Sequence, residues 1–301
     1  MQKRNIKLDV NGLILVNKPR GMSSNQALTA IKKKFHPRKA GHTGTLDPLA
    51  TGLLPICLGQ ATKFSSYLLD EQKTYQATIQ LGYTSSTGDA EGEITPISPN
   101  SNLSKDDIYQ VLEDFKGEIS QLPPMYSALK HNGKPLYKYA REGIEIERKS
   151  RNVSIYGLSV LKWDNDELTL DICCSKGTYI RTLAADIGDK LETGAYIRTL
   201  HRTSIGKLEI KDAISLDELD KIAEEERHGL LKPMDSILFR FDAIYLNKPQ
   251  VKNLKNGIIL EIENLKKAYY RLYDDNMDFI GLGYCYEDGY LKVRRLLNTC
   301  E

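Results

Sequence analysis

Cysteine is scarce in this chain of 301 residues, which contains only five. They are Cys57, Cys173, Cys174, Cys285 and Cys300. The number is odd and the positions are scattered, which argues against a disulfide framework. The adjacent pair also lacks the CxxC spacing of a zinc site. The sequence therefore predicts reduced structural thiols in a cytoplasmic protein, and no metal centre.

Long apolar runs are absent as well. Runs such as residues 13–16 fall far short of the ~18 residues that a membrane-spanning helix needs. The N-terminal residues MQKRNIKLDV lack the apolar core of a signal peptide. We therefore expect no association with a membrane.

Neither sign of charge is in excess, because the chain has 42 basic and 40 acidic residues. Their distribution is more informative. Residues 30–39 contain several bases and no acid, and so do residues 126–141, where tyrosines lie between the bases. The bases of the second segment are Lys130, Lys134, Lys138 and Arg141. Such a pattern can bind phosphates while the rings stack on nucleic-acid bases, but a solvated helix face with its rings in the core would look the same.

The hydrophobic pattern predicts about two domains with mixed secondary structure. Strands are predicted at residues 13–16, 73–81, 153–160 and 167–173, and helices beginning near Ser23, Ser104, Tyr179 and Ser215. Residues 84–100 are predicted to form a polar loop. After Pro233, short antiparallel strands are predicted at residues 258–262, 268–273, 279–286 and 290–297. They indicate a small C-terminal β domain.

The densest motif is residues 41–52, GHTGTLDPLATG. Its glycines permit a tight turn and close approach of the backbone. Pro48 disfavours the helical conformation at Asp47, so the carboxylate would stand on an extended segment. Taken alone, an aspartate in such a loop more often caps a turn than catalyses a reaction. The motif is not GxxxxGK[ST], which disfavours a nucleotide-phosphate loop.

A second motif, residues 175–183, runs from a predicted strand end into a helix. It places Tyr179 and Arg181 near the start of that helix, where side chains often point into a cleft. A surface ion pair for Arg181 and a core position for the Tyr179 ring are the alternatives.

Together these segments resemble the bacterial tRNA pseudouridine-55 synthase family over nearly the whole chain. The matching segments, in chain order, are residues 17–24, 41–63, 73–75, 81–89, 121–130, 136–143, 175–183 and 200–203. One departure is Asn17, where the family usually has aspartate. No residue that the family needs for catalysis is missing.

The resemblance implies an α+β fold, with a mixed, mostly antiparallel central sheet flanked by helices. It divides the chain into a catalytic domain at residues 1–240 and a small PUA-like β domain at residues 241–301. An RNA-gripping insertion is expected at about residues 121–150. The implied activity is isomerisation of uridine 55 in the T loop of tRNA to pseudouridine, by a monomer that needs no cofactor, no metal and no obligatory protein partner.

The resemblance also implies roles for individual residues. Asp47 matches the catalytic aspartate, which either attacks C1′ or removes a proton from C2′, and Arg181 matches its partner. Tyr75 matches the ring under the target uracil and is a candidate for removing the C5 proton, although a phenol is a poor base at neutral pH. The remaining matches are Tyr179 and Leu200 in the uracil pocket, His42 against the opened loop, and Lys18, Lys130, Lys134, Lys138 and Arg141 as RNA contacts.

Three other functions are alternatives to this one. A tRNA-folding chaperone with dispensable catalysis would explain the basic segments but leave Asp47, Tyr75 and Arg181 without a role. A guide-RNA-dependent relative would need partner proteins. A nucleoside hydrolase would need a metal-binding aspartate cluster, and the sequence has nothing resembling one.

Overall fold

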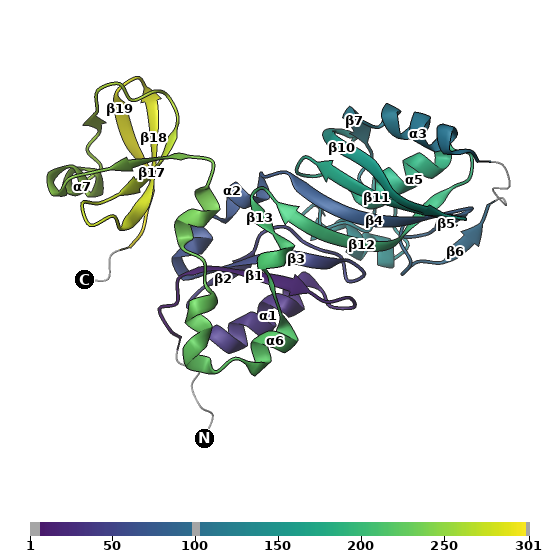
Figure 1. Ribbon diagram of the computed structural model, residues 1–301, viewed down its shortest axis with the longest axis horizontal. Helices are drawn as coiled ribbons and strands as arrows, with labels where there is room; N and C mark the ends of the chain where they lie inside the picture. The colour runs from purple at the N-terminus through teal and green to yellow at the C-terminus, as the bar shows by residue number, and fades with distance from the viewer. Residues whose placement is uncertain (1–6, 98–102, 299–301) are drawn as a thin grey trace.

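The computed structural model describes residues 7–97 and 103–298 and places a large sheet and a small sheet in separate parts of the molecule (Figure 1). The large sheet has ten strands in the order β14-β1-β3-β12-β4-β11-β10-β7, with β13 beside β12 and β2 beside β3. Its strands are β1 Gly12–Lys18, β2 Ala40–His42, β3 Thr51–Leu58, β4 Lys73–Leu81, β7 Gly117–Gln121, β10 Arg151–Asp164, β11 Glu167–Cys174, β12 Ala195–Ile205, β13 Leu208–Glu209 and β14 Ile214–Ser215.

Most neighbouring strands of this sheet run antiparallel. The exceptions are β1 with β14 and β3 with β12, which pair in parallel. The predicted mixed and mostly antiparallel sheet is therefore confirmed. The strands predicted at residues 13–16, 73–81, 153–160 and 167–173 are present, but the long strands β3 and β12 and the short strands β2, β7, β13 and β14 were not predicted.

Helices cover the sheet and complete its core. They are α1 Ser24–Phe35, α2 Ser65–Leu69, α3 Lys105–Asp114, α4 Leu136–Arg141, α5 Ile180–Lys190 and α6 Leu216–Lys221, with short 3-10 turns at Gly59–Lys63, Ile210–Asp212, Glu224–Leu230 and Met234–Leu238. Figure 1 shows α3 and α5 against the β4, β11 and β10 part of the sheet, and α1 and α6 beside β1. Among the described residues, no helix is long and apolar enough to cross a membrane.

The first helix illustrates how the sequence sets these elements. Ser23 caps α1, and the Gln26 side chain returns a hydrogen bond to the cap, as in a capping box. The stripe that includes Ala27, Ile31 and Phe35 is buried against the sheet. The helix ends at Phe35, because the following His36 adopts a left-handed conformation before Pro37.

Two short hairpins extend from the large sheet. Strands β5 Tyr83–Ser85 and β6 Ile94–Pro96 pair within the segment predicted as a loop, so that prediction was wrong at both of these strands. The end of that segment, residues 98–100, lies outside the described residues. The predicted insertion contains the hairpin β8 Lys130–His131 and β9 Lys134–Pro135, followed directly by α4.

The small sheet has the order β15-β17-β18-β19-β16. Its elements are β15 Asp242–Tyr245, α7 Lys248–Lys255, β16 Leu260–Glu261, β17 Tyr269–Tyr273, β18 Phe279–Glu287 and β19 Tyr290–Leu296. Helix α7 and strand β15 were not predicted, and β15 pairs with β17 in parallel. The curled five-stranded sheet nevertheless confirms a PUA-like domain. It packs on the rest of the chain through aromatic contacts such as Phe64 on Phe279, with ring centres 5.5 Å apart.

Candidate active site

Backbone anchors on both sides of Asp47 fix the position of its loop. The Leu46 N–H donates to the Ser24 hydroxyl at 2.8 Å, and the same hydroxyl donates to the Leu46 carbonyl at 2.9 Å. The Pro48 carbonyl accepts from the Gly21 N–H at 2.8 Å. Because both neighbours of Asp47 are held, the carboxylate projects from a rigid stretch of chain.

The first turn of α5 brings Arg181 to this carboxylate. Arg181 is only 7% exposed, and its Nη2 lies 3.1 Å from Asp47 Oδ2. The same guanidinium donates to the Thr87 carbonyl at 2.9 Å and to the Tyr126 carbonyl at 2.6 Å. Its Nη1 also lies 3.4 Å from Asp89 Oδ2. These contacts fix the orientation of the guanidinium, so it holds Asp47 in one direction.

The surroundings of Asp47 favour its neutral form more than water does. Burial raises the pKa of this carboxyl above its usual value, and the guanidinium of Arg181 lowers it in part. The nearby Asp89 raises the pKa further and Lys18 lowers it. The Asp47 side chain nevertheless remains 39% exposed, so a substrate can reach it. A carboxylate held in this way is suited to act as a nucleophile or a base.

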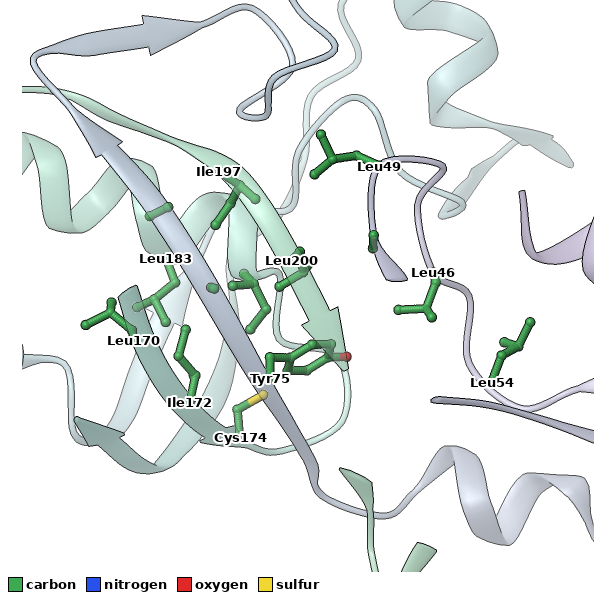
Figure 2. Packing of buried hydrophobic residues seen from close by; sticks show 14 of the residues in the cluster. Leu46, Leu49, Leu54, Tyr75, Leu170, Ile172, Cys174, Leu183, Ile197 and Leu200 are labelled. Carbon is green, nitrogen blue, oxygen red and sulfur yellow. The ribbon is translucent and has the colours of Figure 1, made fainter. Parts of the chain in front are cut away.

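A cavity of about 120 Å³ opens beside this ion pair. Its lining consists of Thr45, Leu46, Asp47, Tyr75, Thr178, Tyr179, Ile180, Arg181 and Leu200. The structure thus brings five of the sequence-predicted site residues together, namely Asp47, Tyr75, Tyr179, Arg181 and Leu200. Figure 2 shows Tyr75 on β4 and Leu200 on β12, with Leu46 on the facing loop.

The two tyrosines of the cavity have different surroundings. Tyr75 is a buried ring on β4, and burial raises the pKa of its phenol above the usual value. It therefore offers a flat surface rather than a base at neutral pH. Tyr179 caps α5, and its backbone N–H and carbonyl both bond to the buried side-chain amide of Gln121, at 3.0 and 3.3 Å. The guanidinium of Arg151 lies 4.6 Å from the centre of the Tyr179 ring.

A larger cavity of about 280 Å³ also borders the ion pair. It shares Asp47 and Arg181 with the smaller one and also borders Tyr126, Tyr137 and Arg141 of the predicted insertion. The insertion therefore forms one wall of the space in front of the carboxylate.

His42 lies at the end of β2 and lines neither of these two cavities. Its Nδ1 is buried and has no hydrogen-bond partner in the described structure. Burial and the nearby Arg202 both lower the pKa of the imidazole, so the ring is neutral near pH 7.

Lys18 is enclosed by the backbone close to the Asp47 loop. Its side chain is 0% exposed, and its ammonium donates to the carbonyls of Pro19 at 2.9 Å, Met22 at 2.6 Å and Pro48 at 3.5 Å. Burial lowers its pKa to about 8. The ammonium thus bonds to backbone turns that include the residue after Asp47, and direct RNA contact by Lys18 stays a prediction from the resemblance.

The other predicted RNA contacts are on the surface of the insertion. Lys130, Lys138 and Arg141 are exposed, whereas Lys134 pairs with Glu142 and lies 4.4 Å above the Tyr139 ring. Among the described residues, three of these four bases make no ion pair.

Two polar residues at the site received no role from the sequence. Asp89 is buried, accepts from the Thr87 hydroxyl at 2.6 Å, and lies against Arg181. Arg202 is buried beneath the Asp47 loop. Both lie in the matched motifs, but burial could not be inferred for either one. No group of three or more His, Cys, Asp or Glu side chains in the described parts of the chain could hold a metal ion.

Comparison with protein-family models covers most of the chain. Residues 32–180 match the N-terminal domain of the TruB family of pseudouridylate synthases. Residues 181–239 match the tRNA pseudouridylate synthase B C-terminal domain, and residues 243–297 match the C-terminal region of pseudouridine synthase II TruB.

Full-length relatives and solved structures agree with these matches. The chain is 44% identical to tRNA pseudouridine synthase B of Methylobacillus flagellatus, over 99% of this chain and 98% of the relative. It is 46% identical to the same enzyme of a Marinomonas species, over 97% and 96%. A chain in the crystal structure of a Cbf5–Nop10–Gar1 complex has a TM-score of 0.70 and 24% identity, over 95% of this chain and 84% of that one, which supports the fold alone. The chain therefore belongs to the TruB family and is a tRNA pseudouridine synthase, an isomerase.

Proposed function

We propose that this enzyme converts uridine 55 in the T loop of tRNA to pseudouridine, with Asp47 as the catalytic carboxylate. The observation that carries the proposal is the Asp47–Arg181 ion pair at 3.1 Å, at the junction of two cavities. The smaller cavity presents Tyr75 and Leu200 to a flipped base, and the larger one leads to the insertion. Flipping the base from its stack costs a few kcal/mol, which phosphate contacts elsewhere would supply.

The reaction is an internal exchange of bonds on one nucleotide. The N1–C1′ bond breaks, the detached uracil rotates, C5 bonds to C1′, and the C5 proton is released while N1 gains a proton. Asp47 starts this either by attacking C1′ or by removing the C2′ proton, and both routes require its ionised form. Arg181 keeps the carboxylate charged and directed, while the Tyr75 ring holds the uracil as it turns.

The supporting parts are assigned in the same proposal. Residues 1–240 form the catalytic domain, with residues 121–150 as an RNA-gripping insertion, and residues 241–301 form the PUA-like domain. His42 contacts the opened loop, and Tyr179 lines the uracil pocket. The protein acts as a monomer in the cytoplasm, without an obligatory protein partner and without a cofactor.

Tritium release tests the position of modification. An unmodified tRNA transcript carrying 5-tritiated uridine is incubated with the purified chain alone. Release of a single tritium per tRNA, and none from a transcript with cytidine at position 55, is the expected result. Release from the cytidine transcript would reject position 55, whereas no release from either would favour a dependence on partner proteins or guide RNA.

Neutralising the basic insertion is expected to weaken tRNA binding and reduce its salt dependence. In a variant with Lys130→Gln, Lys134→Gln and Lys138→Gln, the slope of log affinity against log salt should fall by about 2, because each phosphate contact contributes ~0.7–0.9. Lys134 should contribute least, since it already pairs with Glu142.

The matched control for this variant carries the same three charge changes within or close to residues 211–228, an acid-rich segment with seven acidic and three basic residues. Lys211→Gln, Lys221→Gln and Lys232→Gln should leave the slope unchanged. An equal drop in both variants would mean that overall charge, not the insertion, governs binding. An unchanged slope in the insertion variant would place the RNA footprint elsewhere.

A further inference from the structure

Arg202 is a buried cation that takes no part in the proposed reaction. It is 1% exposed. Among the described residues it makes no ion pair. Its Nε–H donates to the Leu53 carbonyl at 2.8 Å, and its Nη2–H donates to the Gly44 carbonyl at 3.1 Å. A buried guanidinium is costly to desolvate, so a position without a carboxylate partner calls for an explanation.

The two carbonyls that Arg202 holds lie on either side of Asp47 in the chain. Gly44 precedes the catalytic carboxylate by three residues, and Leu53 follows it in β3. One side chain therefore ties together the two ends of the loop. Gly44 has a φ of +95°, a backbone conformation that favours glycine, and it brings its carbonyl to the guanidinium.

The backbone of Arg202 also needs a close approach from the same loop. Gly52 and Arg202 are register partners in the parallel pair β3 and β12. A Cβ at Gly52 would lie 2.4 Å from the Arg202 carbonyl oxygen, a distance that real side chains do not reach. The glycine that closes the motif at residues 41–52 is thus explained by contact with this arginine.

On its other side Arg202 lies directly opposite Tyr75. The two residues are register partners in the antiparallel pair β4 and β12, and both are buried. Side chains in such a pair point to the same face with Cβ atoms about 5 Å apart. The Arg202 charge also favours the ionised form of the Tyr75 phenol, which lowers the pKa of that phenol in opposition to burial.

We propose that Arg202 is a positioning residue, whose guanidinium links both ends of the Asp47 loop to the Tyr75 ring. It thereby fixes the distance between the Asp47 carboxylate and the ring that holds the uracil. This inference rests on the proposed function, because Asp47 and Tyr75 are assigned there. Arg202 touches no reacting atom. It acts on the rate through the two groups that do.

The first test separates turnover from binding. Arg202→Lys keeps the charge but loses the forked geometry that reaches two carbonyls at once. Its single-turnover rate of pseudouridine formation should fall about 100-fold, the scale expected for a misplacement of ~1 Å, while its Kd for tRNA stays near that of wild type. Arg198→Lys on the same strand, where Arg198 is exposed, is the matched control and should retain the wild-type rate.

The second test asks whether Arg202 acts through Tyr75. Tyr75→Phe keeps the ring but removes the phenol hydroxyl on which the Arg202 charge acts. Arg202→Lys should therefore reduce the single-turnover rate less in the Phe background than in wild type. An equal loss in both backgrounds would reduce Arg202 to a general structural role and overturn the link to Tyr75. If Arg202→Lys does not fold, Arg202→Gln replaces it, and failure of both to fold would overturn the proposal.

A third readout does not depend on activity. In protein labelled with ¹³C at tyrosine Cζ, the Tyr75 signal is assigned through Tyr75→Phe and titrated with pH. Cys174 and Asp47 also affect this phenol, and both raise its pKa. Because the Arg202 charge lowers the pKa of this phenol, Arg202→Gln should move the titration to higher pH. An unmoved titration would contradict the contact between Arg202 and Tyr75.

The outcomes for this residue and for the proposed function are distinguishable. A wild-type rate in Arg202→Lys with an inactive Asp47→Asn would overturn only the role of Arg202. Full activity of Asp47→Asn would overturn the proposed function itself.

Discussion

Replacing Asp47 with asparagine is expected to abolish pseudouridine formation and to leave tRNA binding nearly unchanged. Asparagine has almost the same shape, so the loop held through Leu46 and Pro48 should keep its conformation. The amide can neither attack C1′ nor remove the C2′ proton. The expected loss of rate is at least about 10⁴-fold, in the range seen when a nucleophile or general base is removed.

This variant is measured by tritium release beside wild type, with tRNA affinity followed by filter binding. Asp212→Asn is the matched control, because Asp212 pairs with Lys232 on the surface of an acid-rich segment. Retained tRNA refolding by Asp47→Asn, with no product, would reveal a chaperone activity separable from catalysis. Substantial product formation by Asp47→Asn would remove Asp47 from the chemistry and return the chaperone hypothesis to first place.

The elements that the sequence predicted are those whose local pattern matches their burial. Strand β4 alternates buried and more exposed residues along Lys73–Leu81, because one face lies on the core and the other does not. Helix α1 carries both parts of a capping box and a regular apolar stripe. In such segments, the residue type at each position indicates whether its side chain is buried.

The missed strands lack that local signal. Strand β3 is buried along nearly all of Thr51–Leu58 and contains Pro55, so it shows neither alternation nor a proline-free strand pattern. Strand β12 has register shifts near Thr199 and near Ser204, which break the period of two. The parallel pairing of β15 with β17 depends on contacts distant in sequence and could not be inferred from either segment alone.

The active site, too, could be predicted only in part from the sequence. The motifs identified Asp47, Tyr75 and Arg181 through the family resemblance, and the fold brought them to one cavity. The sequence did not reveal which cations are buried. Lys18 and Arg202 are both basic residues in matched motifs, yet each is enclosed by carbonyl groups that come together only in the folded chain. The sequence alone does not show whether a basic residue contacts a phosphate or bonds to backbone carbonyls inside the fold.

Arg181→Lys is expected to reduce turnover far more than tRNA affinity. A lysine ammonium cannot reproduce a planar fork that meets two carboxylates and two carbonyls. Asp47 would lose its fixed direction, and the buried Asp89 would lose part of its charge compensation. We expect the single-turnover rate to fall about 100-fold or more, on the scale of a small misplacement in an active site.

The pH dependence provides a second, independent sign of the same pairing. Arg181 lowers the pKa of Asp47 against the effect of burial, so a weaker pairing leaves that pKa higher. Activity is lost as pH falls and Asp47 is protonated, and the acid limb of the rate profile should therefore move to higher pH in Arg181→Lys. Arg227→Lys is the control, since Arg227 bonds to the Ile222 carbonyl in the acid-rich segment. A slow variant with an unmoved acid limb would mean that Arg181 orients the site without governing the charge of Asp47. Wild-type turnover would show that the ion pair is dispensable for the reaction.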